Sequence, residues 1–516
     1  MDGPGAPPSK LSLALEGAVE YCPQGAHGRR NKTQPPPPLC ALIVVQSAAT
    51  QCDLDHNTWS PWLARIHRTM EKSAILLVGN GRLITREPQQ PLVEDGCVAI
   101  RDGLIAETGP TASLRRNYRG AHFIDARGGL IMSGLINTHM HLYSTFARGM
   151  ALKDAAPGNF TEILERLWWR LDKVLTLDDV YLSAAVAMID CIRNGATTIF
   201  DHHSSPGAVS GSLFRIAEAA RLTGLRSCLC YEVTDREGPE VAQQSIEENR
   251  AFLESCKRSG GDLLRGLFGL HASFTVSDET LEACRRVAAD SDAGFHVHVA
   301  EAEADQTKCL LKHGRRVVGR FHHFGILGSK TIAAHCVHVN DIEIDLLKNS
   351  QTLVVHNPES NMGNAVGCAP VLEMVRRGAR VGLGSDAYTA DMFESLKVAN
   401  LLPKHQTGQP GVGWAEPSEM LFNRNAEFAS ACFGRPLGTL TAGALADLIV
   451  VDYDPPTPIT ESNINSHLLF GVSGRAVRST IIGGRVVMLD RELPGMDEAA
   501  ILAKARAAAQ KLWQRF

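Results

Sequence analysis

The sequence predicts an α/β protein: a (β/α)8 TIM-like barrel with a small β-sandwich domain built from segments on both sides of the barrel. Two observations predict this fold. Over residues 131–433, short apolar runs alternate with amphipathic segments of helical period. Before and after this region, the pattern changes to short β runs separated by turn residues. Alternating strands and helices are typical of a closed parallel sheet with helices on its outer face.

Eight apolar runs are the candidate barrel strands. They cover Leu135–His139, Thr197–Asp201, Ser227–Tyr231, Arg265–His271, Ala293–His298, Thr331–His335, Thr352–His356 and Val381–Gly384. Helix signals lie between them. The segment from Leu177 to Asn194, for example, has Thr176 as its N-cap and Gly195 just past its end. Eight such units over about 260 residues match the size of a (β/α)8 barrel.

Changes in composition predict the rest of the domain organisation. Residues 1–70 contain a proline run and no persistent apolar period, so we expect a disordered N-terminal extension, with Met70 as the natural start. Residues 71–130 and 434–490 carry β runs and should form the two parts of the small β domain. Residues 491–516 are rich in Ala with spaced charges, which predicts a C-terminal helix.

The overall composition argues against several classes of protein. The formal net charge is only -4 with both signs interspersed, so no basic surface for nucleic acid or an anionic membrane is expected. No window approaches the ~20 apolar residues that a membrane span requires. The 13 cysteines lack the spacing of a disulfide framework, which indicates reduced thiols and a cytoplasmic location. A small, roughly neutral substrate fits this composition best.

Nearly every predicted strand ends in a polar or ionisable residue. These residues are His139 and His141, Asp201, Tyr231, His271, His298, His335, His356 and Asp386. In a (β/α)8 barrel the carboxyl ends of all strands meet at one face, where active sites form. We therefore expect these side chains to converge on a single site.

Two of the strands carry histidine pairs at metal-ligand spacing. His139 and His141 are two residues apart, so their imidazoles share a face and can reach one ion, although two hydrogen-bonded histidines would look the same. Sequence alone leaves open whether His296 or His298 binds metal on the fifth strand, and we favour a packed interior position for His296. Together with Asp386, the ligands form a nitrogen-and-oxygen site suited to zinc or iron(II), with a position left for water.

Five short motifs occur in order along the chain: Gly-Leu-Ile-Asn-Thr-His-Met-His, His-Val-Ala-Glu, Ala-Ala-His-Cys-Val-His, His-Asn-Pro-Glu-Ser-Asn and Gly-Ser-Asp. With these motifs, residues 71–490 resemble the amidohydrolase superfamily, in particular its cytosine-deaminase-like and chlorohydrolase (TRZ/ATZ) branch. Within that branch the chain is most similar to the SsnA-type aminohydrolases. The resemblance implies one divalent ion per chain, with zinc expected and iron(II) as the alternative, held by His139, His141, His298 and Asp386.

The resemblance also implies roles for other residues. Glu301 would carry a proton to a ring nitrogen of the substrate, and His335 would polarise or orient the attacking water. Asp386 can take the proton of that water and pass it to the departing nitrogen. The candidate substrate contacts are His271, Asn361 and Arg148. A structural role is the alternative for each of these three.

The resemblance favours one metal ion over two. Binuclear relatives carry a carboxylated lysine on the fourth strand. Here the only lysine between Lys173 and Lys308 is Lys257, which falls in a helical segment. The one-metal subtype is therefore the better match.

These residues predict a metal-dependent hydrolase that acts on carbon–nitrogen bonds other than peptide bonds. The expected reaction is hydrolytic deamination of an aminated nitrogen heterocycle, such as a purine, pyrimidine or triazine, with release of ammonia. The alternatives are a related C–N or C–Cl hydrolysis on similar rings and a catalytically silent barrel that acts as a scaffold. We expect a small heterocyclic substrate and water as partners, no nucleic acid or membrane, and a homodimer, which is common among relatives.

Overall fold

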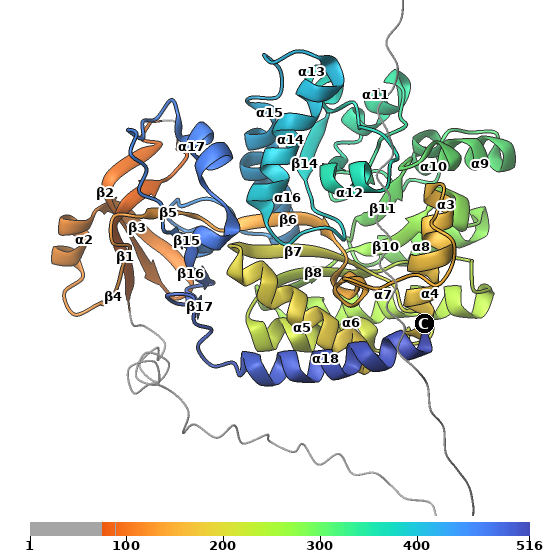
Figure 1. Cartoon of the computed structure of the whole chain (residues 1–516), viewed down its shortest axis with the longest axis horizontal. Helices are drawn as coiled ribbons and strands as arrows, with labels where there is room; N and C mark the ends of the chain where they lie inside the picture. Colours follow the sequence, from red (N-terminus) through yellow and green to blue (C-terminus); the bar gives the residue numbers. More distant parts are fainter. Residues whose placement is uncertain (1–74, 88) are drawn as a thin grey trace, which may run out of the picture. The chain divides into compact units, whose positions relative to one another are not determined.

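The computed structural model describes residues 75–516, apart from residue 88. The predicted disordered extension over residues 1–70, with its start at Met70, lies outside these residues. The described chain forms one mixed sheet and a set of parallel strands surrounded by helices (Figure 1). This arrangement confirms the predicted α/β class.

The mixed sheet is built from two distant segments of the chain. Its strands are β1 (Leu76–Ile84), β2 (Leu92–Arg101), β3 (Leu104–Pro110), β4 (His122–Asp125), β5 (Leu130–Ser133), β15 (Leu448–Val451), β16 (Val477–Ile482) and β17 (Arg485–Met488). The first half of β1 pairs with β4 and its second half pairs with β5, so the sheet branches. β5 and β15 pair antiparallel and join the two segments.

The barrel strands are parallel. All eight predicted strands are present, and because the fourth is split in two, the described residues form nine. They are β6 (Leu135–Met140), β7 (Ala196–His203), β8 (Arg226–Tyr231), β9 (Leu264–Gly266), β10 (Phe268–Ala272), β11 (Phe295–Val299), β12 (Ile332–His335), β13 (Leu353–His356) and β14 (Arg380–Leu383). The predicted fourth strand is split into β9, which pairs with β8, and β10, which pairs with β11. Single parallel bridges from Val233 to Leu270 and from Met140 to Asp386 close the barrel.

Helices follow the strands, as the sequence pattern predicts. They include α5 (Leu177–Arg193), α6 (Ser212–Thr223), α7 (Pro239–Ser259), α8 (Asp278–Ala289), α9 (Glu303–His313), α10 (Val317–His323), α11 (Asp341–Asn349), α13 (Val371–Arg377), α14 (Met392–Thr407), α16 (Asn425–Phe433) and α18 (Glu498–Arg515). α5 begins at the predicted N-cap, where Thr176 and Asp179 form a capping box. α18 packs along α5 and buries Ala505 and Leu512 (Figure 1). In the described residues we find no helix that is both long and apolar enough to span a bilayer.

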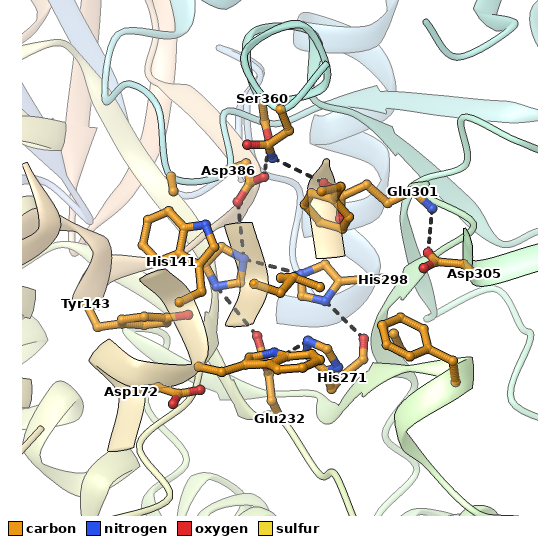
Figure 2. Close-up of a pocket in the computed structure, with 18 of the residues that line it drawn as sticks. His141, Tyr143, Asp172, Glu232, His271, His298, Glu301, Asp305, Ser360 and Asp386 are labelled. Atoms are coloured by element: carbon orange, nitrogen blue, oxygen red, sulfur yellow. Dashed lines mark hydrogen bonds and ion pairs between the residues drawn. The ribbon is translucent and has the colours of Figure 1, made fainter. Parts of the chain in front are cut away.

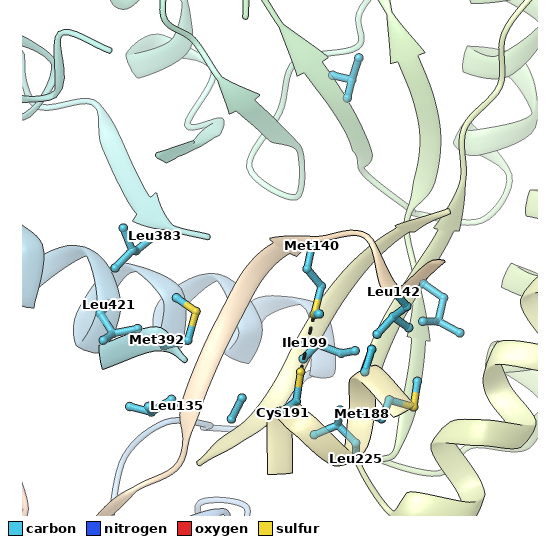
Figure 3. Packing of buried hydrophobic residues seen from close by; sticks show 14 of the residues in the cluster. Leu135, Met140, Leu142, Met188, Cys191, Ile199, Leu225, Leu383, Met392 and Leu421 are labelled. Carbon is cyan, nitrogen blue, oxygen red and sulfur yellow. Dashed lines mark hydrogen bonds between the residues drawn. The ribbon is translucent and has the colours of Figure 1, made fainter. Parts of the chain in front are cut away.

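An apolar core between the barrel strands and α5 fixes the first barrel strand. Met140 of β6 lies with its sulfur 3.9 Å from the thiol of Cys191 on α5. Leu135 and Ile199 belong to the same cluster and are at most 1% exposed (Figure 3). Burying one such side chain stabilises the fold by about 1.5–3 kcal/mol. The core therefore holds β6, and with it the histidine pair at its end.

A buried ion pair links the barrel to the mixed sheet. Nε and Nη2 of Arg226, at the start of β8, each lie 2.8 Å from one carboxylate oxygen of Asp447, just before β15. The two side chains are 2% and 1% exposed. Asp447 also accepts a hydrogen bond from the backbone N–H of Gly483. The pair is bidentate and shielded from solvent. Removal of either partner would leave an uncompensated charge in the interior.

Asp447→Asn is expected to lower the free energy of unfolding by about 3–5 kcal/mol, because it leaves a buried guanidinium charge uncompensated. Arg250→Gln is the control, since the ion pairs of Arg250 with Glu247 and Glu254 are exposed. The free energy of unfolding of this control should stay close to that of the wild type. Urea unfolding followed by circular dichroism measures both variants, and equal losses would contradict a structural role for the buried pair.

Candidate active site

Four of the predicted residues meet at the carboxyl ends of β6, β11 and β14. Nε2 of His141 lies 3.3 Å from Nε2 of His298 and 3.2 Å from Oδ1 of Asp386. Nε2 of His139 lies 3.8 Å from the same oxygen. All four side chains are buried. Figure 2 shows His141, His298 and Asp386 turned toward one another.

Main-chain carbonyls fix the tautomers of two of these histidines. Nδ1 of His141 lies 2.5 Å from the carbonyl oxygen of His202, and Nδ1 of His298 lies 3.0 Å from that of His271. Because a carbonyl can only accept, each Nδ1 carries the hydrogen and each Nε2 keeps its lone pair. This outer hydrogen bond is the one that orients metal-binding histidines in proteins.

The ring of His139 is held at Nδ1 by His296. Nδ1 of His139 lies 2.8 Å from Nε2 of His296, which is 1% exposed. Among the described residues, Nε2 of His139 has no hydrogen-bond partner, although it is fully buried. A buried nitrogen without a partner is unfavourable unless something binds it. The packed interior position expected for His296 agrees with this contact.

These groups fit a divalent metal ion. Three Nε2 lone pairs and one carboxylate oxygen crowd together, and only positive charge between them relieves their repulsion. Nitrogen and oxygen donors in this number are those that zinc and iron(II) prefer.

Glu301 and His335 lie beside Asp386. Nε2 of His335 is 3.6 Å from Oε2 of Glu301 and 3.8 Å from Oδ2 of Asp386. Nδ1 of His335 is 2.8 Å from Oδ1 of Asn361, which turns the other ring nitrogen toward the carboxylates. Burial and the neighbouring charge of Asp386 raise the pKa of Glu301 well above its usual range. The raised pKa favours the protonated form of Glu301, which can donate a proton.

The backbone at two of these positions is in the left-handed region. φ is +74° at His335 and +54° at Asp386, and such strain is concentrated at functional sites. Gly384 allows β14 to approach β6, because a Cβ there would lie 2.5 Å from Oδ1 of Asn357 and 3.0 Å from Cβ of His139. The Gly-Ser-Asp motif thus brings Asp386 to the first strand.

A cleft opens above this centre and holds about 650 Å³ of empty space, including its open mouth. Its aromatic walls are Tyr143, Phe160, Trp168, Trp169, Phe274 and Tyr388. Flat rings stack favourably on such side chains. The cleft can therefore take a planar heterocycle over the centre.

The three predicted substrate contacts lie in different places. His271 lines the cleft, with Nδ1 2.7 Å from Oγ1 of Thr275. Asn361 is buried behind His335. Arg148 pairs with Asp190 at 3.3 Å, and its side chain is 68% exposed. Neither Asn361 nor Arg148 is among the described residues that line this cleft. Contact of all three with a substrate stays a prediction.

Glu232 was not predicted as a site residue from the sequence. This residue directly follows Tyr231, the polar residue expected at the end of the third strand, and it lines the cleft. Its Oε1 lies 3.1 Å from Nδ1 of His202 and 3.7 Å from Nδ1 of His141. A signal was present in the sequence, since Glu232 is the first ionisable residue after that strand.

Two other polar strand ends, Asp201 and Tyr231, have structural contacts instead, and a third, His356, is buried without a hydrogen bond from its ring. Asp201 accepts a hydrogen bond from the backbone of Leu142 at 2.8 Å. The hydroxyl of Tyr231 accepts one from the backbone of Ser205 at 3.0 Å. His356 is fully buried, and neither of its ring nitrogens has a hydrogen-bond partner in the described part of the chain. Convergence at the barrel mouth therefore holds for some strand ends and not for all.

His356 makes the fold sensitive to acid. Burial lowers its pKa to about 3. In the unfolded chain this histidine has a pKa of about 6.5 and binds a proton that it does not bind in the folded chain. The contribution of His356 to stability is therefore complete above about pH 6.5 and is lost as the pH falls toward about 3.

Between about pH 6 and pH 4, the free energy of unfolding should fall less steeply in His356→Gln than in the wild type. The two slopes should differ by up to about 1.4 kcal/mol per pH unit. Urea unfolding at several pH values measures this slope. His323→Gln, at an exposed position on α10, is the control and should keep the wild-type slope. A wild-type slope in His356→Gln as well would contradict the assignment.

Known proteins share the sequence pattern. Residues 130–487 match the model of the Amidohydrolase family, and residues 96–121 match a bacterial imidazolonepropionase-like composite domain. A 5'-deoxyadenosine deaminase from Methanosarcina mazei is 31% identical over 446 residues, which cover 86% of this chain and 99% of that protein. A 5-methylthioadenosine/S-adenosylhomocysteine deaminase from Syntrophobacter fumaroxidans is 33% identical over 447 residues, or 85% and 98% of the two proteins.

Solved structures share the fold. An adenosine deaminase from Xanthomonas campestris with bound zinc superposes with a TM-score of 0.76 at 23% identity, over 86% of this chain and 99% of that chain. An atrazine chlorohydrolase from Arthrobacter aurescens in complex with zinc gives a TM-score of 0.70 at 21% identity, over 84% and 100%. The predicted resemblance is confirmed: this chain belongs to the amidohydrolase family.

Proposed function

We propose that the protein is a metal-dependent hydrolase that removes the amino group of a nitrogen heterocycle and releases ammonia. One observation carries the proposal: His139, His141 and Asp386 form one group that could hold an ion, Nε2 of His298 lies 3.3 Å from that of His141, and Glu301 lines the same aromatic cleft. The relatives named as deaminases of 5'-deoxyadenosine and 5-methylthioadenosine support a reaction at a C–N bond other than a peptide bond.

We propose zinc as the ion, one per chain, with iron(II) as the alternative. His139, His141, His298 and Asp386 would hold it, and the zinc in two solved neighbours supports this choice. When bound, the ion makes hydroxide available at neutral pH by lowering the pKa of water from ~15.7 toward ~7.

The residues around the site would move the protons that the reaction requires. Asp386 takes the proton of the attacking water and passes it to the departing amino nitrogen. His335, with its free Nε2 lone pair, orients the water. Glu301 protonates the ring nitrogen next to the reacting carbon, so negative charge does not build up there. A C–O bond forms, the C–N bond breaks, the remaining hydroxyl proton goes to the Glu301 carboxylate, and ammonia leaves a keto product.

A screen for ammonia release over aminated purines, pyrimidines and triazines tests this function. We expect release from at least one of these classes, loss of activity with a chelator and recovery with zinc. Chloride release from chlorinated triazines, measured in the same screen, identifies the related C–Cl hydrolysis. Zinc-loaded protein that acts on none of these rings would contradict the proposal and favour the scaffold.

We also propose a homodimer in the cytoplasm. The ten cysteines of the described residues are all unpaired, and eight of them are buried, which supports a reducing compartment. Light scattering on the purified protein measures the oligomeric state directly.

A further inference from the structure

Glu232 has no part in the reaction proposed above, yet its carboxylate lies in the cleft beside the metal ligands. Its backbone N–H donates to the carbonyl of His203 at 2.8 Å, which fixes the residue at the end of β8. The side chain is only 3% exposed. A buried carboxylate is unfavourable unless it receives hydrogen bonds or faces a cation. The donors available to it therefore decide what it does.

His202 is the nearest ring, and in its neutral form it has no N–H for this carboxylate. Its Nε2 lies 3.0 Å from the carbonyl oxygen of His296, and a carbonyl can only accept, so Nε2 carries the hydrogen. In the neutral ring, Nδ1 is then a lone pair that faces Oε1 of Glu232 at 3.1 Å, and this nitrogen has no hydrogen-bond partner. Two acceptors thus face each other.

Neutral His271 also has no N–H for Glu232, because the hydrogen on its ring is donated elsewhere. Its Nδ1 lies 2.7 Å from Oγ1 of Thr275, whose hydroxyl donates to the carbonyl of Ala272 at 3.0 Å. Nδ1 of His271 must therefore be the donor, and Nε2 presents a lone pair 3.9 Å from Oε2 of Glu232. Nδ1 of His141, the third neighbour, already donates to a carbonyl. Among the described residues, the carboxylate receives no hydrogen bond from these neutral rings.

The two glutamates of the cleft lie on opposite sides of the histidine pair. Figure 2 shows Glu301 on one side of His141 and His298, and Glu232 on the other. Both glutamates line the same cleft, between aromatic walls. A planar ring over the centre would therefore meet a proton donor at one edge and an acceptor at the other.

We propose that Glu232 determines specificity by accepting a hydrogen bond from an N–H or amino group on the ring edge opposite the nitrogen that Glu301 protonates. The inference rests on the proposed deaminase function. Oε1 of Glu232 is 3.7 Å from Nδ1 of His141, and the residue lines the cleft that holds the centre, so the carboxylate can face a ring bound there.

This position selects a chemical class of substrate. The preferred rings are amino-oxo heterocycles whose aminated carbon lies between an acceptor nitrogen and an N–H, as in guanine or isocytosine. Adenine rings carry a lone pair or a C–H at the second edge, and a carboxylate disfavours both. A site built around an N–H donor discriminates strongly against a ring that lacks it, because the buried acceptor is then left unpaired.

Steady-state kinetics of ammonia release and calorimetric binding test the proposal on guanine, 1-methylguanine, isocytosine and adenine. Zinc-loaded wild type should bind the amino-oxo rings at least about tenfold more tightly than adenine. Glu232→Gln should raise KM for guanine by about tenfold or more with little change in kcat, since the contact exists before and during the reaction. 1-Methylguanine lacks the N–H, so its KM should exceed that of guanine in the wild type. This difference in KM should be smaller in Glu232→Gln.

Glu237→Gln is the matched control. Glu237 follows the same strand but pairs with Lys173 at 3.0 Å and does not line the cleft, so wild-type values are expected. Equal losses on guanine and adenine in Glu232→Gln would overturn the proposal. So would a lower zinc content in that variant, which would make Glu232 a metal ligand. If no ring releases ammonia, the proposed function fails, and calorimetry still decides this inference: no preference for amino-oxo rings overturns it.

Discussion

Glu301→Gln is expected to slow ammonia release by about 10²- to 10⁴-fold, the usual contribution of a positioned proton donor. The amide has nearly the same shape but no acidic proton to give to the ring nitrogen. The main-chain bond from Glu301 N–H to Oδ2 of Asp305, at 2.9 Å, does not involve the side chain and should survive. Zinc content and thermal stability should therefore stay close to those of the wild type.

Steady-state rates on the best substrate of the screen measure this effect. Glu303→Gln is the control, because Glu303 is two residues away and exposed at the start of α9. Its rate should equal that of the wild type. Equal activity of Glu301→Gln and Glu303→Gln would remove Glu301 from the reaction.

His298→Gln should reduce ammonia release by about 10⁴-fold or more, because loss of the ion returns the pKa of water from near ~7 to ~15.7 and leaves almost no hydroxide at neutral pH. Treatment of the wild type with a chelator should have the same effect. Zinc should restore the chelated wild type and fail to restore His298→Gln at the same concentration. Full activity in metal-free protein would contradict a metal-dependent reaction.

Local patterns were sufficient for much of the fold. Thr176 and the acidic residues after it marked the start of α5, and the apolar runs marked the eight barrel strands. The split of the fourth strand was not predictable, because it depends on pairing with two different neighbours. β9 pairs with β8, and β10 pairs with β11, and these partners are distant in sequence. Register of that kind is a property of the closed barrel.

The site shows the same division between local and distant information. Spacing and strand ends were enough to propose His139, His141 and Asp386, and the fold brings these three together with Nε2 of His298 3.3 Å from that of His141. The choice between His296 and His298 was open, because both face the same way along the strand. Only the contact of His296 with Nδ1 of His139 separates their positions.

Residues beyond the strands were harder to place. Glu232 lies one position past the strand end that the sequence indicated, and its direction depends on how β8 and the following segment bend toward the cleft. Arg148 follows the first strand closely, but its side chain turns to Asp190 on α5. Proximity in sequence to a catalytic strand does not fix the direction of a long, flexible side chain.

A crystal structure of zinc-soaked protein, with anomalous data at the zinc edge, tests the metal centre most directly. We expect one strong peak about 2.0–2.2 Å from Nε2 of His139, His141 and His298 and from a carboxylate oxygen of Asp386. No peak at this point, or a peak held by His202 and Glu232 in its place, would contradict the proposed centre and the reaction built on it.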